Sequence, residues 1–333
     1  MFGIIGNGSW ATALAKMLTD NGNRVHWWMR NERSVTHLQK KHHNPQYLTS
    51  VNFDPALILP STDLQQVVAA CEVVLICVPS AYIKEVLQQL PEDSLRGKLV
   101  ISAIKGILPE QYILLNDYLH THYKLPANQY VAITGPCHAE EVAQERLSYL
   151  TFSGLESTTT ERLAQNFRTD YIRTTVNQDL WGAQYAAVLK NIYAVGAGMA
   201  HGLGYGDNFL SVYITNCYRE MYGFLQTQYQ QSNSVAEAPD FHTSAYLGDL
   251  LVTAYSPHSR NRSFGTLLGK GYSVMAATTE MSMVAEGYFA ARGMNQVAEA
   301  MGISMPIMKQ IHNALWEQCQ PDEAFSAIEL LLS

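Results

Sequence analysis

The sequence has few cysteines and none of the spacings that usually hold metals or disulfides. Its five cysteines are odd in number, lie far apart and never form a C-x-x-C pair. The eleven histidines include no H-E-x-x-H pattern, and the pair His42 and His43 stands in a polar stretch typical of a solvated surface rather than a metal site. These absences give no disulfide or zinc framework, and we expect a reducing compartment and no bound metal.

Long apolar runs and an excess of positive charge are also missing. No run approaches the roughly 18 residues of a membrane span, and residues 1–5 lack the basic flank and cleavage site of a signal peptide. The net charge of −7 argues against a bare nucleic-acid binder but leaves room for an anionic metabolite. We therefore expect a soluble, cytoplasmic protein without stable membrane insertion and without a nucleic-acid partner.

The patterning of the 333 residues predicts two domains. Over residues 1–180, short apolar runs alternate with helical patterns, which is typical of a doubly wound, Rossmann-like α/β domain with a parallel sheet covered on both faces. Over residues 181–333 the periodicity is helical almost throughout, which predicts an all-α domain. We expect the catalytic cleft between the two, at the carboxyl ends of the strands.

Individual elements follow from the same periodicities. We expect strands at 2–5, 24–30, 72–78, 98–103, 130–134, 147–153 and 171–175, and helices at 12–21, 64–70, 80–90 and 182–200. Gly22 is well placed to end the first helix. Residues 31–60 are expected to form a surface excursion with a third short element, and the polar residues 226–243 an exposed loop.

The hexapeptide GNGSWA, which begins at Gly6, fits G-x-G-x-x-A between a strand and a helix. Gly6 would allow the tight turn, Gly8 would let the backbone approach a pyrophosphate, and the small Ala11 would let helix and strand pack closely. The helix N-terminus would add N–H donors and a positive dipole end. This context favours dinucleotide binding, with Ser9 and Trp10 beside the cofactor, over a plain glycine turn.

The turn after the second strand bears on cofactor choice. An acidic residue there would bind the ribose of NAD, whereas this turn contains Arg30 and Arg33 with Glu32 between them. Because the guanidinium of arginine can bind a 2′-phosphate, we predict that the protein can use NADP. The expected cofactor is therefore NAD or NADP. The alternative is that both arginines only solvate a turn.

Motifs along nearly the whole chain resemble one family. The segments GNGSWATALA, VPS, KG, GPCHAEEV, VLKNIYAVGAGMAHGLGYGDN, LGDLLVT, SRNRSFG and EGY occur in this order. Each is short, but the ordered set is specific, and the chain resembles the bacterial NAD(P)-dependent glycerol-3-phosphate dehydrogenases. The resemblance implies reversible reduction of dihydroxyacetone phosphate, a small phosphorylated substrate, to glycerol 3-phosphate for phospholipid synthesis. It also allows a homodimer.

Lys190 is the only charged residue in the otherwise apolar run 186–197. Such a lysine should face a cleft, where desolvation would lower its pKa and suit it to proton transfer, unless it snorkels from a helix face. The resemblance implies that Lys190 is the general acid/base and that Asn191 is a neighbouring group at the substrate. It also implies that Lys105 contacts nicotinamide and substrate, and that Asp249 orients a lysine or a substrate hydroxyl. For Asp249 the alternative is a carboxylate favoured by a helix N-terminus.

The run Ser259, Arg260, Asn261 is the strongest indication of a phosphorylated substrate. Arginine binds phosphate through a planar, charge-assisted fork. An isolated run of this kind would more often be a solvated loop, but the resemblance makes these three residues the expected phosphate site. It also places Arg260 near the cofactor, together with Val284 and Glu286.

The loop after the strand at 130–134 is expected to contact ligand oxygens through backbone N–H groups. The resemblance assigns Gly135 and Cys137 to the substrate and Ala139 to the cofactor. Cys137 stands where serine or threonine is usual in the family, which would weaken or remove one substrate hydrogen bond. A thiol nucleophile is the alternative, but the local motif contains no evident base.

Overall fold

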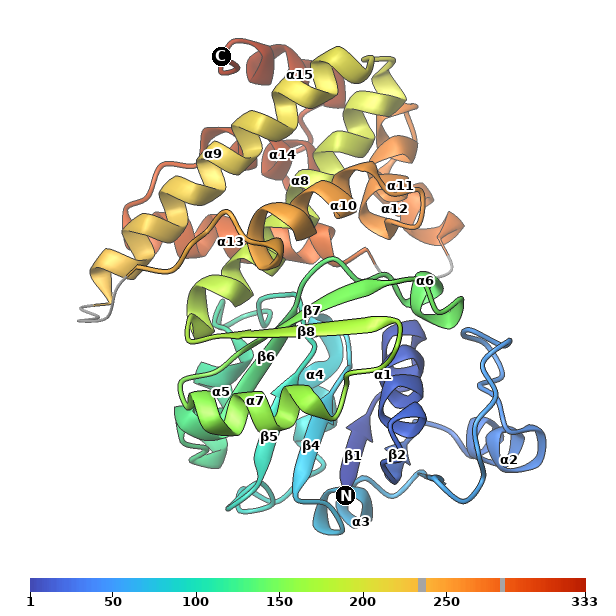
Figure 1. The fold of residues 1–333 in the computed structure, drawn as a ribbon. Coiled ribbons are helices and arrows are strands. Elements are labelled where there is room, and N and C mark those ends of the chain that lie inside the picture. The colour runs from blue at the N-terminus through green and yellow to red at the C-terminus, as the bar shows by residue number, and fades with distance from the viewer. Residues whose placement is uncertain (233–237, 282–284) are drawn as a thin grey trace. The chain divides into compact units, whose positions relative to one another are not determined.

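The computed structural model describes residues 1–232, 238–281 and 285–333 (Figure 1). The chain forms two compact units. The first comprises Met1–Ile104 and Leu114–Leu180, and the second comprises Lys105–Ile113 and Trp181–Ser333. The short segment that begins at Lys105 therefore belongs with the helical unit, although it follows a strand of the sheet.

The first unit is built on one eight-stranded sheet with the order β3-β2-β1-β4-β5-β6-β7-β8 (Figure 1). The strands are β1 (Phe2–Ile5), β2 (Val25–Trp28), β3 (Ile58–Ser61), β4 (Val73–Ile76), β5 (Leu99–Ser102), β6 (Tyr130–Thr134), β7 (Ser148–Ser153) and β8 (Ile172–Asn177). Strands β1 and β4 are buried along their whole length, as expected for the centre of a covered parallel sheet.

The direction of the last two strands differs from the prediction. Strands β1 to β6 are parallel, but β7 pairs antiparallel with β6, and β8 pairs parallel with β7. The connection between β6 and β7 contains only the five-residue helix α6 (Ala139–Ala143). A parallel return normally needs a longer crossover, usually a full helix, so this short connection brings the chain back antiparallel.

Seven helices are described in the first unit. They are α1 (Ser9–Asp20), α2 (Glu32–Lys41), α3 (Leu64–Ala69), α4 (Ile83–Leu87), α5 (Leu115–Tyr123), α6 and α7 (Ser157–Gln165), with short 3₁₀ turns at Ser80–Tyr82 and Ala127–Gln129. Helix α1 begins earlier than predicted because Gly8 is its N-cap, and Gly22, with φ of 75°, follows its end as predicted.

Helix α2 was missed in the segment predicted as a surface excursion. Its N-cap Asn31 accepts a hydrogen bond from the Ser34 N–H, and Val35 and Leu38 are its buried apolar residues. Two apolar residues in three turns give too weak a periodicity to mark an amphipathic helix. The cap and the tertiary contacts of this segment therefore specify the helix.

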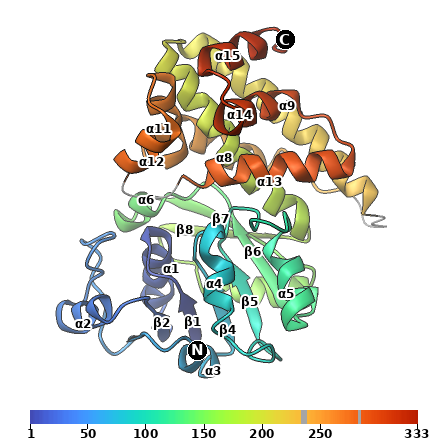
Figure 2. The same ribbon diagram turned by 180° about the vertical axis from the view of Figure 1, so that it is seen from behind.

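The second unit is helical, and no strand follows Asn177 in the part of the chain that the structure describes. Its helices are α8 (Leu180–Leu203), α9 (Asp207–Gln231), α10 (Asp249–Tyr255), α11 (Arg260–Gly269), α12 (Val274–Glu280), α13 (Glu286–Met301), α14 (Pro306–Trp316) and α15 (Pro321–Glu329), with a π-helical turn at Ser244–Gly248. Helix α14 packs against α9, α13 and α15 (Figure 2). None of the described helices has the length and apolarity that crossing a membrane requires.

The predicted loop at 226–243 is wrong at its start, because α9 continues to Gln231. Glutamine has a good helix propensity, so a polar, glutamine-rich segment can extend a helix on its solvent side. Part of the predicted loop, residues 233–237, lies outside the described residues.

Glycines bring the backbones of α8 and α11 together. A Cβ atom at Gly265 would overlap the carbonyl oxygen of Val195, and one at Gly198 would overlap the carbonyl oxygen of Arg262. The glycine-rich stretch in the middle of α8 is therefore a helix-packing surface, and it fixes α11 against the part of α8 that follows Lys190.

Candidate active site

The glycine turn leaves the N-terminus of α1 open to a ligand. Gly6 has φ of 115°, and a Cβ there would lie 2.8 Å from the carbonyl oxygen of Cys77, so only glycine fits. A Cβ at Gly8 would meet no atom within 4 Å, which leaves space for a close approach to the backbone. Ala11 is fully buried. Because Gly6 and Gly8 carry no side chains, a pyrophosphate can approach the backbone at the start of this twelve-residue helix, as in a dinucleotide site.

A second glycine loop follows β6 at the same edge of the sheet, because β1, β4, β5 and β6 run parallel. Gly135 has φ of 110°, and a Cβ there would lie 2.9 Å from the carbonyl oxygen of Tyr149. Cys137 and Ala139 are both buried. The first unit therefore presents two turns that require glycine, after β1 and after β6, on one edge.

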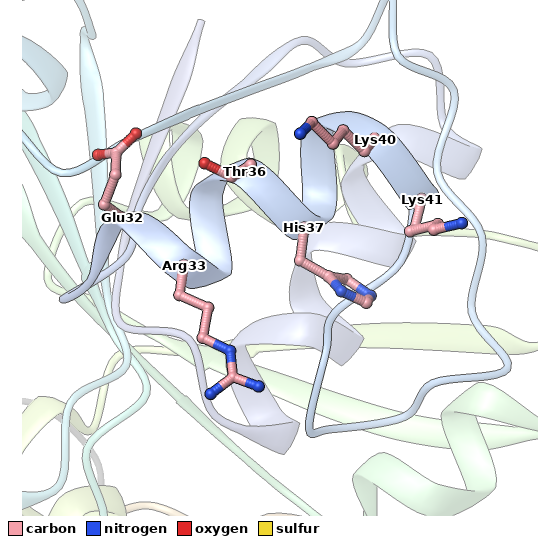
Figure 3. Close-up of a pocket in the computed structure, with 6 residues that line it drawn as sticks. All are labelled: Glu32, Arg33, Thr36, His37, Lys40 and Lys41. Atoms are coloured by element: carbon pink, nitrogen blue, oxygen red, sulfur yellow. The ribbon is translucent and has the colours of Figure 1, made fainter.

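The two arginines predicted to select the cofactor are exposed beyond β2. Arg30 precedes α2, and Arg33 lies on its first turn. A hollow of about 390 Å³ on α2 is lined by Glu32, Arg33, Thr36, His37, Lys40 and Lys41 (Figure 3). Figure 3 shows Arg33 and His37 directed to the same side of the helix. Among the described residues, Arg33 is the only predicted site residue that lines this hollow, and the predicted catalytic residues lie elsewhere.

Three charged side chains that the sequence singled out meet in the second unit. Lys190 on α8 donates a hydrogen bond to Oδ1 of Asp249 on α10. The other carboxylate oxygen, Oδ2, lies 3.6 Å from Nζ of Lys105. The side chains of Lys190 and Asp249 are 5% and 2% exposed, and that of Lys105 is 18% exposed. Lys190 therefore does not snorkel to solvent, and one carboxylate lies between two ammonium groups.

The pKa of Lys190 is lowered to about 7, chiefly by burial, because a charged ammonium is poorly solvated in this surrounding. The negative charge of Asp249 and its hydrogen bond act in the opposite direction, while the positive charge of Lys105 acts in the same direction as burial. A lysine with this pKa can both give and take a proton near neutral pH. The cluster also carries more positive than negative charge, which would stabilise a developing alkoxide.

Two buried asparagines connect this cluster to the neighbouring helices. Asn191 donates from Nδ2 to the carbonyl oxygen of Lys105 at 3.2 Å and accepts at Oδ1 from Nδ2 of Asn261 at 2.9 Å. Asn261 in turn accepts at Oδ1 from the Gly287 N–H at 2.9 Å. Both amides thus have protein partners at each end, and the chain of bonds fixes the backbone position of Lys105.

The predicted phosphate residues lie at the start of α11. Ser259 is its N-cap, with Oγ accepting from the Arg262 N–H at 3.3 Å. Arg260 is exposed at the first helical position, whereas Asn261 is buried in the network described above. Glu286 opens α13. Val284 lies outside the described residues.

Two further polar residues at the glycine turn could not be predicted from the sequence. Asn44 and Thr12 are both completely buried, and they hydrogen-bond to each other and to the turn. Asn44 stands in a polar segment where nothing distinguishes it from solvated neighbours.

Among the described residues, no group of three or more histidine, cysteine, aspartate or glutamate side chains could hold a metal ion.

Comparison with known families matches both parts of the chain. The family model described as "NAD-dependent glycerol-3-phosphate dehydrogenase N-terminus" matches residues 2–160. The model described as "NAD-dependent glycerol-3-phosphate dehydrogenase C-terminus" matches residues 179–326. The two models thus cover both the glycine turns and the lysine–aspartate cluster.

Full-length relatives agree with these matches. Glycerol-3-phosphate dehydrogenase (NAD(P)+) of Agathobacter rectalis is 32% identical over 329 residues, which cover 98% of this chain and 95% of the relative. The enzyme of the same name from Bacillus subtilis is 31% identical over 98% of this chain and 92% of its own length. The crystal structure of glycerol-3-phosphate dehydrogenase from Coxiella burnetii has a TM-score of 0.88 at 27% identity, covering 99% of this chain and 98% of that one.

A protein with a different name also has a similar fold. A ketopantoate reductase family protein from Ralstonia eutropha has a TM-score of 0.60 at 16% identity, covering 97% of this chain and 99% of its own. At that identity the likeness concerns the fold alone. The fold therefore does not select the substrate, and the substrate has to be argued from the residues of the site.

Proposed function

Since the chain belongs to the NAD-dependent glycerol-3-phosphate dehydrogenase family, we propose that Lys190, Lys105 and Asp249 form the catalytic centre that interconverts dihydroxyacetone phosphate and sn-glycerol 3-phosphate. The protein is an oxidoreductase that acts on a CH–OH group with NAD or NADP. The main support for these residue roles is the buried carboxylate of Asp249, which lies between the ammonium groups of two lysines.

The first unit would hold the dinucleotide. Gly6 and Gly8 shape the turn, and Ser9 and Trp10 begin the helix whose N-terminal N–H groups suit a pyrophosphate. The bound nicotinamide supplies hydride for reduction of the ketone and accepts it in the reverse reaction. Arg30 and Arg33 would bind the 2′-phosphate of NADP, and Ala139, Arg260, Val284 and Glu286 would complete the cofactor contacts.

Lys190 would hold the proton that the reaction needs. In the direction of reduction, its ammonium donates a proton to the oxygen of the ketone as negative charge develops there. In the reverse direction, the neutral amine takes that proton from the alcohol. Asp249 orients the ammonium through its hydrogen bond, and Lys105 adds a second positive charge beside the same carboxylate.

The substrate phosphate would bind at the start of α11. Arg260 is exposed at the first position of this ten-residue helix, where a guanidinium fork and helix N–H groups can serve one anion. Ser259 and Asn261 already have protein partners, so they would add to the site with their remaining hydrogen-bonding capacity. Asn191, Gly135 and Cys137 would line the rest of the substrate site.

We propose further that the glycerol 3-phosphate supplies phospholipid synthesis, that the enzyme works in the cytoplasm and that it forms a homodimer. None of the five cysteines, all of which the structure describes, forms a disulfide, and this supports a reducing setting. Size-exclusion chromatography with light scattering tests the homodimer, and a mass of one chain would contradict it.

A spectrophotometric assay tests the function. NADH and NADPH oxidation are followed with dihydroxyacetone phosphate, with unphosphorylated dihydroxyacetone, and with pyruvate and acetoacetate as ketoacid alternatives. We expect turnover of dihydroxyacetone phosphate far above that of the other three ketones. Preferred turnover of a ketoacid would contradict the phosphate site and favour a related 2- or 3-hydroxyacid dehydrogenase instead.

A further inference from the structure

Asn44 is a completely buried asparagine that lies between α2 and β3 and contacts the glycine turn. Its Nδ2 donates to the carbonyl oxygen of Asn7 at 3.0 Å and to Oγ1 of Thr12 at 2.9 Å. Its Oδ1 accepts from the backbone N–H groups of Gln46 and Tyr47, at 3.0 and 3.2 Å. Because Oδ1 faces two N–H donors, the orientation of the amide is fixed, and both of its hydrogens are directed to the α1 side.

The contact with Thr12 extends to the next residue of the turn. Oγ1 of Thr12 donates to the carbonyl oxygen of Gly8 at 3.0 Å while it accepts from Asn44. The carbonyl oxygen of Gly6 accepts from the indole Nε1 of Trp27 at 2.6 Å. Three successive carbonyl groups of the turn thus accept hydrogen bonds from buried side chains. Asn44 binds the Asn7 carbonyl directly, and its partner Thr12 binds the Gly8 carbonyl through Oγ1 as well as through its backbone N–H, at 3.0 Å.

These bonds determine where the amide hydrogens of the turn point. A trans peptide group is planar, and its C=O and N–H point in opposite directions. A carbonyl of Asn7 held toward Asn44 therefore directs the Gly8 N–H away from Asn44. In the same way, a carbonyl of Gly8 held by Thr12 directs the Ser9 N–H to the opposite side. Gly8 is also the place where a Cβ would meet no atom within 4 Å.

We propose that Asn44 is a positioning residue for the dinucleotide, because it sets the peptide planes whose N–H groups would bind the pyrophosphate. The inference rests on the proposed function, in which the turn at Gly6 to Ser9 holds NAD or NADP. Asn44 would not touch the cofactor. It would restrict the conformations of the glycine-containing turn before the cofactor binds. Binding would then cost less conformational entropy.

The test is a set of variants read by NADH binding. Asn44→Asp keeps the oxygen that accepts from Gln46 and Tyr47 but replaces the donor that holds the turn. Asn52→Asp is the control, since it adds the same charge to the same segment at an exposed residue that bonds only weakly to Ser50, at 3.4 Å. We expect the dissociation constant of NADH, titrated by fluorescence, to rise at least tenfold in Asn44→Asp and to stay at the wild-type value in Asn52→Asp.

Thr12→Val provides a second, uncharged variant of nearly the same shape. It removes the hydroxyl between Asn44 and Gly8, so NADH binding should weaken severalfold, and the double variant should weaken it by less than the product of the two single effects. Activity at saturating NADH should keep kcat close to wild type while the KM for NADH rises. If Asn44→Asp fails to fold, Thr12→Val alone decides the question through the same titration.

The outcomes separate this inference from the proposed function. Wild-type NADH affinity in both folded variants would overturn the role of Asn44, and so would a lowered unfolding temperature with unchanged NADH affinity. Wild-type protein that binds NADH but does not reduce dihydroxyacetone phosphate would contradict the proposed function and leave the role of Asn44 intact. Binding of neither NADH nor NADPH by wild type would contradict both.

Discussion

Oδ2 of Asp249 lies 3.6 Å from Nζ of Lys105, while Oδ1 of the same carboxylate accepts a hydrogen bond from Lys190. Burial lowers the pKa of Lys190 and the negative charge of Asp249 raises it, and the net result is a pKa of about 7. In the direction of ketone reduction Lys190 must be protonated, so the rate should fall as the pH rises through this pKa. Oxidation of glycerol 3-phosphate should show the opposite slope.

The first prediction is that Asp249→Asn shifts this pH profile to lower pH. Without the carboxylate charge, the pKa of Lys190 falls further, and a smaller fraction of Lys190 is protonated at neutral pH. The measurement is kcat for dihydroxyacetone phosphate reduction against pH at saturating NADH. Asp240→Asn is the control, because Asp240 is an exposed carboxylate paired with His242. An unchanged midpoint, or one at higher pH, would show that Asp249 does not tune Lys190.

The second prediction concerns cofactor choice. Arg30→Asp should lower kcat/KM for NADPH much more than for NADH, because the 2′-phosphate loses a positive partner and meets a negative one. Lys124→Asp makes the same change of charge at an exposed residue after α5, away from α2, and should leave the ratio of the two values unaltered. A wild-type enzyme that does not use NADPH would rule out the assignment of Arg30.

The third prediction concerns phosphate recognition by Arg260. Arg260→Lys keeps the charge but loses the fork, and a charge-assisted hydrogen bond contributes about 1.5–3 kcal/mol, so kcat/KM for dihydroxyacetone phosphate should drop by about tenfold to a hundredfold. Arg292→Lys, at an arginine over the ring of Trp316, should have little effect. Equal loss with unphosphorylated dihydroxyacetone would mean that Arg260 does not bind the phosphate.

The fourth prediction concerns the contact of α8 with α11. Gly265→Ala should reduce the free energy of unfolding by about 1–3 kcal/mol or more, because the added methyl meets the backbone of Val195, which cannot move aside cheaply. Gly223→Ala on α9, where an added Cβ meets nothing within 4 Å, should stabilise the protein by up to about 1 kcal/mol. Chemical denaturation measures both, and effects of equal sign would contradict the packing argument.

The sequence predicts those parts of the fold that depend on local pattern. The strand at 130–134 and the long helix after residue 180 were found because buried parallel strands and buried helices give continuous apolar runs. Helix α2 was missed because its stability comes from a cap and two buried residues. The direction of β7 was missed because the pairing partner of a strand depends on the connection between the strands and not on the pattern of the strand itself.

In the site, too, some features could be predicted from the sequence and others could not. Lys190 could be singled out because a lone cation in an apolar run is rare, and its burial follows from that context. The links from Asn191 to Asn261 and from Asn44 to Asn7 could not be predicted, since an amide can pair with almost any polar group. Such partners lie far apart in the sequence, and only the packing of the helices and loops decides which of them meet.

Lys190→Met and Lys190→Arg show whether Lys190 donates the proton. Methionine fills similar space without a charge, and arginine stays protonated. Steady-state reduction of dihydroxyacetone phosphate is measured beside NADH binding by fluorescence. We predict intact NADH binding and a fall in kcat of roughly 10² to 10⁴ in both variants, the usual size of general acid–base assistance. Intact binding with nearly full activity in Lys190→Met would mean that Lys190 does not donate the proton.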